Sequence, residues 1–197
     1  MIKSDLRLIY LAKREALSSI EKAEIDAALL NWVKQLPLLE VKVVHLFLPI
    51  LAKNEIDTWP IIRHFWNNYP EIRVVVPVAN FKLKEMTSVV LTPTTEIAVN
   101  KWGIPEPVKD QPHYQEIPPQ EIDLVLVPLL AVDKTGQRVG YGAGFYDRFL
   151  ETAKPTVVTV GLSQFSILDE PISDVLPTDI AIQKVITPQG IIQLPQL

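Results

Sequence analysis

The feature that most constrains the fold is a set of short, almost uninterrupted apolar runs. Residues 43–48 are rich in β-branched side chains and stop at Pro49, and residues 123–128 form a second strong run. Runs of this length without polar alternation predict strands buried on both faces, as in a parallel sheet. Further strands are expected at residues 72–78, 84–91, 156–161 and 184–187.

Helix-like segments separate these runs. The N-terminal segment, residues 1–36, predicts two helices, the second starting at a capping box of Ser18 and Glu21 and ending at Pro37. Two further helices are expected, one capped by Thr58 and running to about residue 68, the other at residues 145–153.

Strands that alternate with helices predict an α/β fold, here a three-layer α/β/α sandwich with a mostly parallel central sheet. Residues 92–120 are rich in proline and are expected to be irregular. Because no repeat or linker divides the chain, residues 1–197 are expected to form a single domain.

Composition excludes several kinds of protein. The chain has no cysteine, which excludes disulfides, thiolate metal sites and cysteine nucleophiles. The net charge of −4 argues against nucleic acid as a partner. The apolar runs are too short to cross a bilayer and the N-terminus lacks an apolar signal core, so we expect a cytoplasmic protein without membrane contact. We separately expect a monomer. His45, His64 and His113 show no metal-ligand spacing, and His45 is expected to be a buried core histidine.

A glycine-rich segment, residues 136–148, lies between the strand expected at 123–128 and the helix expected at 145–153. Gly140, Gly142 and Gly144 alternate there, and glycine lets the backbone approach a ligand closely. With the free N–H groups of the next helix, and with Arg138 and Arg148 beside it, the segment can cradle a phosphate. It matches neither a Walker loop nor the GxGxxG spacing of a dinucleotide fold. A tight turn that uses glycine for steric reasons remains the alternative.

Residues 138–148, RVGYGAGFYDR, resemble the signature of the 5-formyltetrahydrofolate cyclo-ligase (methenyltetrahydrofolate synthetase) family, which is close to R-[LV]-G-x-G-x-G-[YF]-Y-D. Three other segments follow in the family's order: residues 3–7 resemble K-x-x-[LM]-R, residues 55–58 resemble an E-x-D-T loop, and residues 102–107 resemble a G-I-x-E-P segment. The resemblance spans nearly the whole chain. It implies a Rossmann-like fold with the topology of isomerases and CoA transferases.

The resemblance implies an ATP site in which Lys3, Arg7 and Arg138 are the catalytic cations. The residues implied to bind ATP are Lys3, Ser4, Asp5, Leu6, Arg7, Arg138, Val139, Gly140, Tyr141, Gly142, Ala143, Gly144, Phe145 and Tyr146. Without the resemblance, Lys3, Arg7 and Arg14 would form one solvated face of a helix.

The resemblance also implies Asp147 and Asp179 as Mg²⁺ ligands, although Thr178 stands where the family has histidine. Mg²⁺ uses few carboxylates and shares the phosphates of its nucleotide, so two aspartates suit it. Without the resemblance, Asp147 would be a carboxylate that stabilises the start of a helix.

A folate site is implied as well. Its residues would be Ile50, Glu55, Met86, Trp102, Tyr141, Gly142, Ala143, Gly144 and Phe145. Glu55 lies in a loop after a strand, where α/β sheets bind ligands, and would accept hydrogen bonds from the pterin ring. Without the resemblance, Glu55 would be a surface carboxylate, and core packing would explain any one of the apolar residues equally well.

The expected activity is the cyclisation of 5-formyltetrahydrofolate to 5,10-methenyltetrahydrofolate, with ATP as co-substrate and release of ADP and phosphate. The family implies phosphorylation of the formyl oxygen and then attack by N10, so the protein positions the substrates and neutralises charge. Two alternatives remain: an α/β enzyme that binds a sugar phosphate without ATP, and a folate-binding module without catalysis. Lys3 and Arg7 weigh against the first, and the glycine-rich segment with Asp147 weighs against the second.

Overall fold

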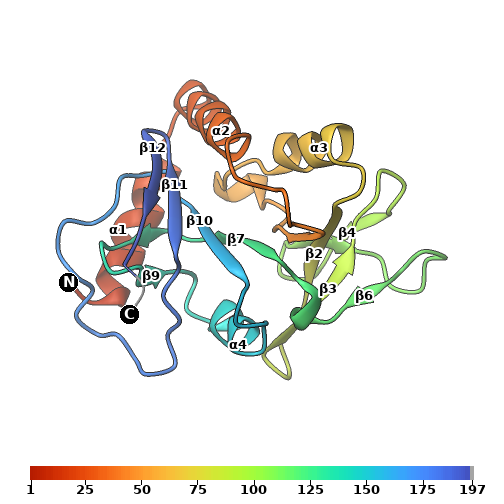
Figure 1. Ribbon diagram of the computed structural model, residues 1–197. Helices are drawn as coiled ribbons and strands as arrows, with labels where there is room; N and C mark the ends of the chain where they lie inside the picture. The colour runs from red at the N-terminus through yellow and green to blue at the C-terminus, as the bar shows by residue number, and fades with distance from the viewer. Residues whose placement is uncertain (196–197) are drawn as a thin grey trace.

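An eight-stranded sheet forms the centre of the computed structural model, which describes residues 1–195 (Figure 1). The strands lie in the order β12-β11-β10-β7-β1-β2-β3-β6. Their bounds are β1 Val43–His45, β2 Arg73–Asn80, β3 Glu85–Val90, β6 Glu116–Ile117, β7 Leu124–Pro128, β10 Val158–Leu162, β11 Lys184–Thr187 and β12 Gly190–Gln193. The strands from β11 to β2 pair in parallel, and β3, β6 and β12 pair antiparallel at the two edges. The prediction of a mostly parallel sheet is confirmed.

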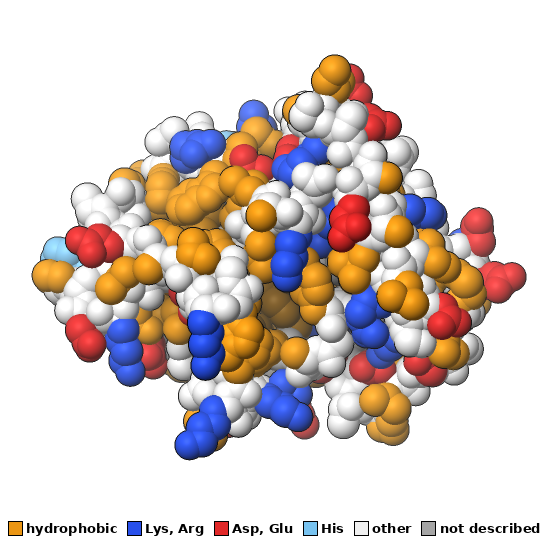
Figure 2. All heavy atoms as spheres, turned by 180° about the vertical axis from the view of Figure 1, so that it is seen from behind, with side chains coloured by type: hydrophobic (Ala, Val, Ile, Leu, Met, Phe, Trp, Pro, Cys, Tyr) orange, Lys and Arg blue, Asp and Glu red, His pale blue; other side chains and the backbone are white. Residues whose placement is uncertain are grey.

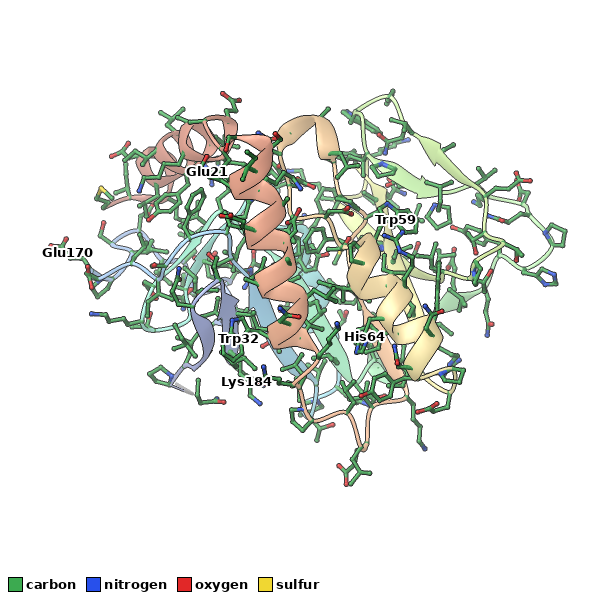
Figure 3. All side chains as sticks on the ribbon, turned by 90° about the horizontal axis from the view of Figure 1, so that it is seen from above. Glu21, Trp32, Trp59, His64, Glu170 and Lys184 are labelled. Atoms are coloured by element: carbon green, nitrogen blue, oxygen red, sulfur yellow. The ribbon has the colours of Figure 1, made fainter. Side chains whose placement is uncertain are left out.

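Helices cover both faces of this sheet, so the predicted three-layer α/β/α sandwich is confirmed as well. On one face, α2 (Ser19–Val33) and α3 (Trp59–Asn68) lie side by side, as the view from above shows (Figure 3). On the other face lies α4 (Phe145–Glu151) (Figure 1). Successive residues of a strand point to opposite faces, so in β7 Leu126 packs below α2 and α3 while Val127 packs on the α4 side.

The helix α1 (Lys3–Glu15) does not cover the sheet. It packs against a hairpin of β8 (Ala131–Val132) and β9 (Arg138–Val139), which leads directly into the glycine-rich segment. Leu6 and Tyr10 of α1 bury themselves against this hairpin in a small separate core. The packing therefore holds the polar face of α1 beside the glycines, although more than 100 residues separate them in the chain.

Two predicted helix starts had different outcomes. The capping box before α2 is confirmed, since the Ser18 hydroxyl accepts a hydrogen bond from the Glu21 N–H at 3.2 Å and the Glu21 carboxylate accepts the Ser18 N–H at 2.9 Å. Thr58 is the N-cap residue of α3, as predicted, but its side chain does not cap the helix, because its buried hydroxyl donates to the Phe47 carbonyl at 2.6 Å. Thr58 therefore ties α3 to the loop after β1.

The expectation of irregular structure at residues 92–120 holds for most of the segment but misses several short elements. This segment forms a hairpin of β4 (Ile97–Val99) and β5 (Pro105–Pro107), the edge strand β6 and a short 3-10 helix, η2 (Pro119–Glu121). The hairpins and the last strand, β12, consist of two to four residues each, too few to leave a periodic pattern in the sequence. The first strand is shorter than the predicted residues 43–48, since β1 ends at His45. A further 3-10 helix, η1 (Leu51–Lys53), follows the loop after β1.

Candidate active site

A cavity of about 930 Å³ opens at the carboxyl ends of the central parallel strands. Residues that follow β1 and β7, such as Leu48 and Leu129, line it together with the end of β2, the start of α1 and the glycine-rich segment. This is the edge at which parallel sheets bind ligands, because the loops after neighbouring strands meet there. Seen from behind, the molecule has a central hollow with hydrophobic side chains inside it and Lys and Arg side chains around it (Figure 2).

Most residues predicted for the site border this one cavity, although they come from distant parts of the chain. The bordering residues are Lys3, Ser4, Arg7, Ile50, Glu55, Met86, Arg138, Gly140, Tyr141, Gly142, Ala143, Gly144, Phe145, Tyr146, Asp147 and Asp179. The cavity therefore combines a cationic helix end, a glycine loop, two aspartates, a glutamate and an apolar wall.

Four predicted residues do not line the cavity. The side chains of Leu6 and Val139 are buried in the small core beneath α1, so they pack and do not reach a ligand. Asp5 is exposed and accepts a hydrogen bond from the Ser4 hydroxyl at 3.3 Å. Trp102 is half-exposed and stacks outside the lining on Phe81.

The glycine loop, residues 140–144, joins β9 to α4. Gly142 and Gly144 have φ angles of 93° and 68°, which only glycine adopts without strain. A Cβ atom on Gly142 would lie 3.1 Å from the guanidinium carbon of Arg7. Arg7 in turn donates from Nε to the Gly140 carbonyl at 2.8 Å. The glycines are therefore needed for the loop to lie against the cations of α1, and a steric turn alone does not account for that contact.

Cations and carboxylates alternate at the end of the cavity next to α1. Arg138 is buried and donates to Asp147 Oδ1 at 2.7 Å and to the Ile180 carbonyl. Burial lowers the pKa of Arg138, while the charges of Asp147 and Asp179 act against that shift. Lys3 forms an ion pair with Asp179.

Asp147 and Asp179 each border the cavity with a carboxylate group. Burial acts to raise the pKa of Asp179, but the hydrogen bonds from Lys3 and the Leu176 N–H lower it below its usual value. Within residues 1–195, Asp147 Oδ2 and Asp179 Oδ1 accept no hydrogen bond, and no cluster of three metal-ligating side chains occurs. Mg²⁺ needs only one or two carboxylates when phosphates and water complete its octahedron, so this pair suits it.

Glu55 is a buried carboxylate, with 6% of its surface exposed, and not the surface residue that its charge alone suggests. Its Oε2 accepts the Ile50 N–H at 2.7 Å, and its Oε1 accepts the hydroxyl of Tyr141. Arg14 lies 3.9 Å from Oε1. Each carboxylate oxygen keeps a lone pair for a further donor, so the group can bind two N–H groups of a ligand.

Three residues around the cavity were not expected as parts of a site. Arg14 is 5% exposed, although its charge suggested a solvated face; its spacing of seven residues from Arg7 was the available signal. Glu106 borders the cavity, with its carboxylate accepting the Ala79 N–H at 2.8 Å. Phe81 lies between Trp102 and Phe145, with ring centroids 3.9 Å and 5.1 Å away. Glu106 is the glutamate of the G-I-x-E-P segment, which was the available signal, whereas no local pattern in the sequence marks Phe81.

His45 lies under the site and is the satisfied core histidine that the sequence predicted. Its ring nitrogens are 3.0 Å from the Ser88 hydroxyl and 3.4 Å from the Tyr146 hydroxyl. Burial lowers the pKa of His45 from 6.5 to about 3, and burial raises the pKa of Tyr146. Both groups are therefore neutral at physiological pH and form a rigid support for the start of α4.

Comparisons with known proteins agree on one family. The family model described as the 5-formyltetrahydrofolate cyclo-ligase family matches residues 2–188. The 5-formyltetrahydrofolate cyclo-ligase of Escherichia coli K12 is 31% identical over 141 residues, which are 71% of this chain and 74% of that protein. The Mycoplasma genitalium protein of the same name is 29% identical over 82% of this chain and 84% of its own length.

Solved structures agree with these sequence matches. The NMR structure of the 5,10-methenyltetrahydrofolate synthetase of Aquifex aeolicus has a TM-score of 0.80 and 28% identity, over 100% of this chain and 95% of that one. The 5,10-methenyltetrahydrofolate synthetase of Mycoplasma pneumoniae has a TM-score of 0.69 and 25% identity, over 94% and 98% of the two chains. Within the described residues, no helix is long and apolar enough to cross a membrane.

Proposed function

The chain belongs to the 5-formyltetrahydrofolate cyclo-ligase family, and from this premise we propose that its cavity cyclises 5-formyltetrahydrofolate to 5,10-methenyltetrahydrofolate with ATP and Mg²⁺. The observation that carries the proposal is the single cavity in which Lys3, Arg7 and the glycine loop lie near the buried carboxylate of Glu55. A nucleotide and a folate can therefore bind in contact with each other.

The reaction has two steps and balances without any further reagent. The formyl oxygen attacks the γ-phosphorus of ATP, the bond from that phosphorus to the β–γ bridging oxygen breaks, and ADP leaves. N10 of the folate then attacks the formyl carbon, the bond from that carbon to the phosphorylated oxygen breaks, phosphate leaves, and the N10 proton passes to solvent. The protein supplies position and charge, because the reacting groups all belong to the substrates.

The nucleotide subsite consists of α1 and the glycine loop. Gly142 lets the loop backbone approach the phosphates, and Arg7 lies against it; within residues 1–195 its terminal nitrogens donate no hydrogen bond, so they can bind an anion. Lys3 and Arg138 add positive charge where the transferred phosphoryl group develops negative charge. In the free protein the carboxylates of Asp179 and Asp147 balance these two cations.

Mg²⁺ would be held by Asp147 and Asp179, and when bound it would neutralise phosphate charge. Each side chain keeps one carboxylate oxygen, Asp147 Oδ2 and Asp179 Oδ1, that accepts no hydrogen bond within residues 1–195. The Ile180 N–H at 3.1 Å from Asp147 and the Leu176 N–H at 2.5 Å from Asp179 orient the two side chains. Backbone donors of this kind keep the carboxylates in place when their cationic partners turn to the phosphates.

The folate subsite lies around Glu55. The carboxylate would accept two N–H bonds from the pterin, and Ile50, Met86 and Phe145 would pack on the ring. An apolar wall excludes water from the reacting formyl group, and exclusion of water strengthens the charge interactions there.

The test is formation of the methenyl product and ADP in equal amounts from 5-formyltetrahydrofolate and Mg-ATP. Asp147→Asn should remove most of the turnover while the protein stays folded, and Asp169→Asn is the matched control, since Asp169 is an exposed aspartate paired with Lys134. Folded wild-type protein that forms neither product would overturn the proposal. Folate binding without ADP release would indicate a binding module, and binding of sugar phosphates in preference to ATP would indicate the isomerase-like alternative.

A further inference from the structure

A chain of hydrogen bonds joins the end of α1 to Glu55. Arg14 donates from its two terminal nitrogens to the Tyr141 hydroxyl at 3.1 Å and to the Leu129 carbonyl at 3.0 Å. Its Nε donates to the Gln164 amide oxygen at 2.8 Å. Every nitrogen of the guanidinium therefore has a partner, and the group is fixed in one orientation.

Tyr141 is the middle link of this chain. Its hydroxyl accepts from Arg14 and donates to Glu55 Oε1. Burial and the negative charge of Glu55 raise the pKa of Tyr141, so the hydroxyl keeps its proton and remains a donor. The ring itself is partly exposed, with Lys53 Nζ 5.3 Å from its centre. Tyr141 thus connects the glycine loop directly to the carboxylate of Glu55.

The loop that carries Glu55 is tied to the same helix through its backbone. Asn54 has a left-handed conformation, with φ at 50°, and its amide donates to the Arg14 carbonyl at 3.2 Å. The Gln164 amide donates to the Asn54 carbonyl at 2.8 Å. Arg14 therefore holds the Glu55 loop twice, once through its backbone and once through its side chain.

We propose that Arg14 and Tyr141 are positioning residues for the folate, fixing Glu55 so that its carboxylate meets the substrate's N–H groups in the right plane. The proposal rests on the proposed function, in which Glu55 binds the pterin. A carboxylate that accepts two donors gains affinity only if its plane is set before binding, because ordering it at the moment of binding costs free energy. The Arg14 cation also offsets the cost of burying the negative charge of Glu55.

Tyr141→Phe tests this without removing any packing group. It should raise the KM for 5-formyltetrahydrofolate about tenfold, the loss expected for one hydrogen bond to a charged group. Because the lost contact is equal in the ground and transition states, kcat should stay within about threefold, and the KM for ATP should change little. Tyr69→Phe, a half-buried tyrosine on the α3 side of the sheet, is the matched control.

Arg14 is tested by a pair of substitutions. Arg14→Gln should raise the folate KM more than Tyr141→Phe does, and Arg14→Lys should restore part of the loss because it keeps the charge. Arg73→Gln is the control, since Arg73 pairs with Glu121 at 3.2 Å on an exposed surface. If Arg14→Gln does not fold, the folate KM of Arg14→Lys is compared with that of Tyr141→Phe instead. Circular dichroism and the melting temperature show whether each variant is folded.

The results separate this inference from the proposed function. Wild-type protein that forms no methenyl product overturns the proposed function, and that result is obtained before any variant is made. Active wild-type protein with an unchanged or lower folate KM in Tyr141→Phe overturns the inference alone. A fall in kcat with both KM values unchanged also overturns it, because that pattern indicates a role in the chemical step or the fold and not in the position of Glu55.

Discussion

Acid should destabilise this protein through a single buried histidine. His45 lies in β1 and is completely buried. Its ring centroid is 4.8 Å from that of Phe149, and its nitrogens are hydrogen-bonded to the hydroxyls of Ser88 and Tyr146. Among residues 1–195 no carboxylate forms an ion pair with the ring, and burial lowers its pKa from 6.5 to about 3. His45→Gln removes the titrating group and keeps a polar side chain in its place.

The sign and size of the effect follow from the two pKa values. The unfolded chain binds a proton at His45 below about pH 6.5, whereas the folded chain does so only near pH 3. The stability that depends on neutral His45 is therefore complete above pH 6.5 and is lost progressively as the pH falls from 6.5 toward 3. One pH unit inside this window corresponds to about 1.4 kcal/mol, so the loss from pH 7 to pH 5 is about 2 kcal/mol.

The assay is urea unfolding of the wild type and of His45→Gln at pH 7 and pH 5. The wild type should lose about 2 kcal/mol more than the variant between the two pH values, or about 4–8 °C in melting temperature for a domain of this size. Acidic groups titrate in both proteins, so their contributions cancel in this comparison. His113→Gln, which removes an exposed imidazole, should behave as the wild type. Equal losses in the wild type and His45→Gln would refute the reasoning.

Three further predictions concern a glycine, a cap and the core. Gly142→Ala should cost about 1–2 kcal/mol of stability, because alanine is strained at a φ of 93°, and it should weaken ATP binding, because the new methyl group displaces Arg7; Gly103→Ala, also at positive φ but in open space, should leave ATP binding unchanged in the same titration. Ser18→Ala should lower the free energy of unfolding by about 0.5–2 kcal/mol in urea without changing activity. Phe65→Ala, at a fully buried position, should cost about 3–5 kcal/mol in the same assay.

Much of the fold was predictable because its central strands carry their own signal. Parallel strands covered on both faces are predominantly apolar, and the runs that became β1, β2, β7, β10 and β11 have that property. The capping box at Ser18 and Glu21 was equally local, since its hydrogen bonds join residues three apart. Short edge strands such as β6 and β12 were not predictable, because they depend on pairing with distant strands.

The same difference between local signals and distant contacts holds for the site. The residue types were predictable from the segments at 3–7, 55–58 and 138–148, whose motifs are contiguous. Their partners were not, since the contacts of Arg14 with Tyr141 and of Lys3 with Asp179 join residues 127 and 176 positions apart. Likewise, Thr58 stands at the N-cap position of α3, yet in the folded chain its hydroxyl donates to the Phe47 carbonyl and not to the helix.

The sequence by itself determined the α/β class, the buried parallel strands and the chemistry available to the site, because periodicity, capping and contiguous motifs act over a few residues. Only the tertiary structure decided which charges are buried and what they bind. From their charge alone, Arg14 and Glu55 were expected to be solvated surface groups, but both are buried and linked through Tyr141. Leu6 and Val139 belong to segments predicted to bind a ligand, but their side chains lie in the core. Burial and hydrogen-bond partners depend on how α1, β9 and the loop after β1 pack together, and no local stretch of sequence encodes that packing.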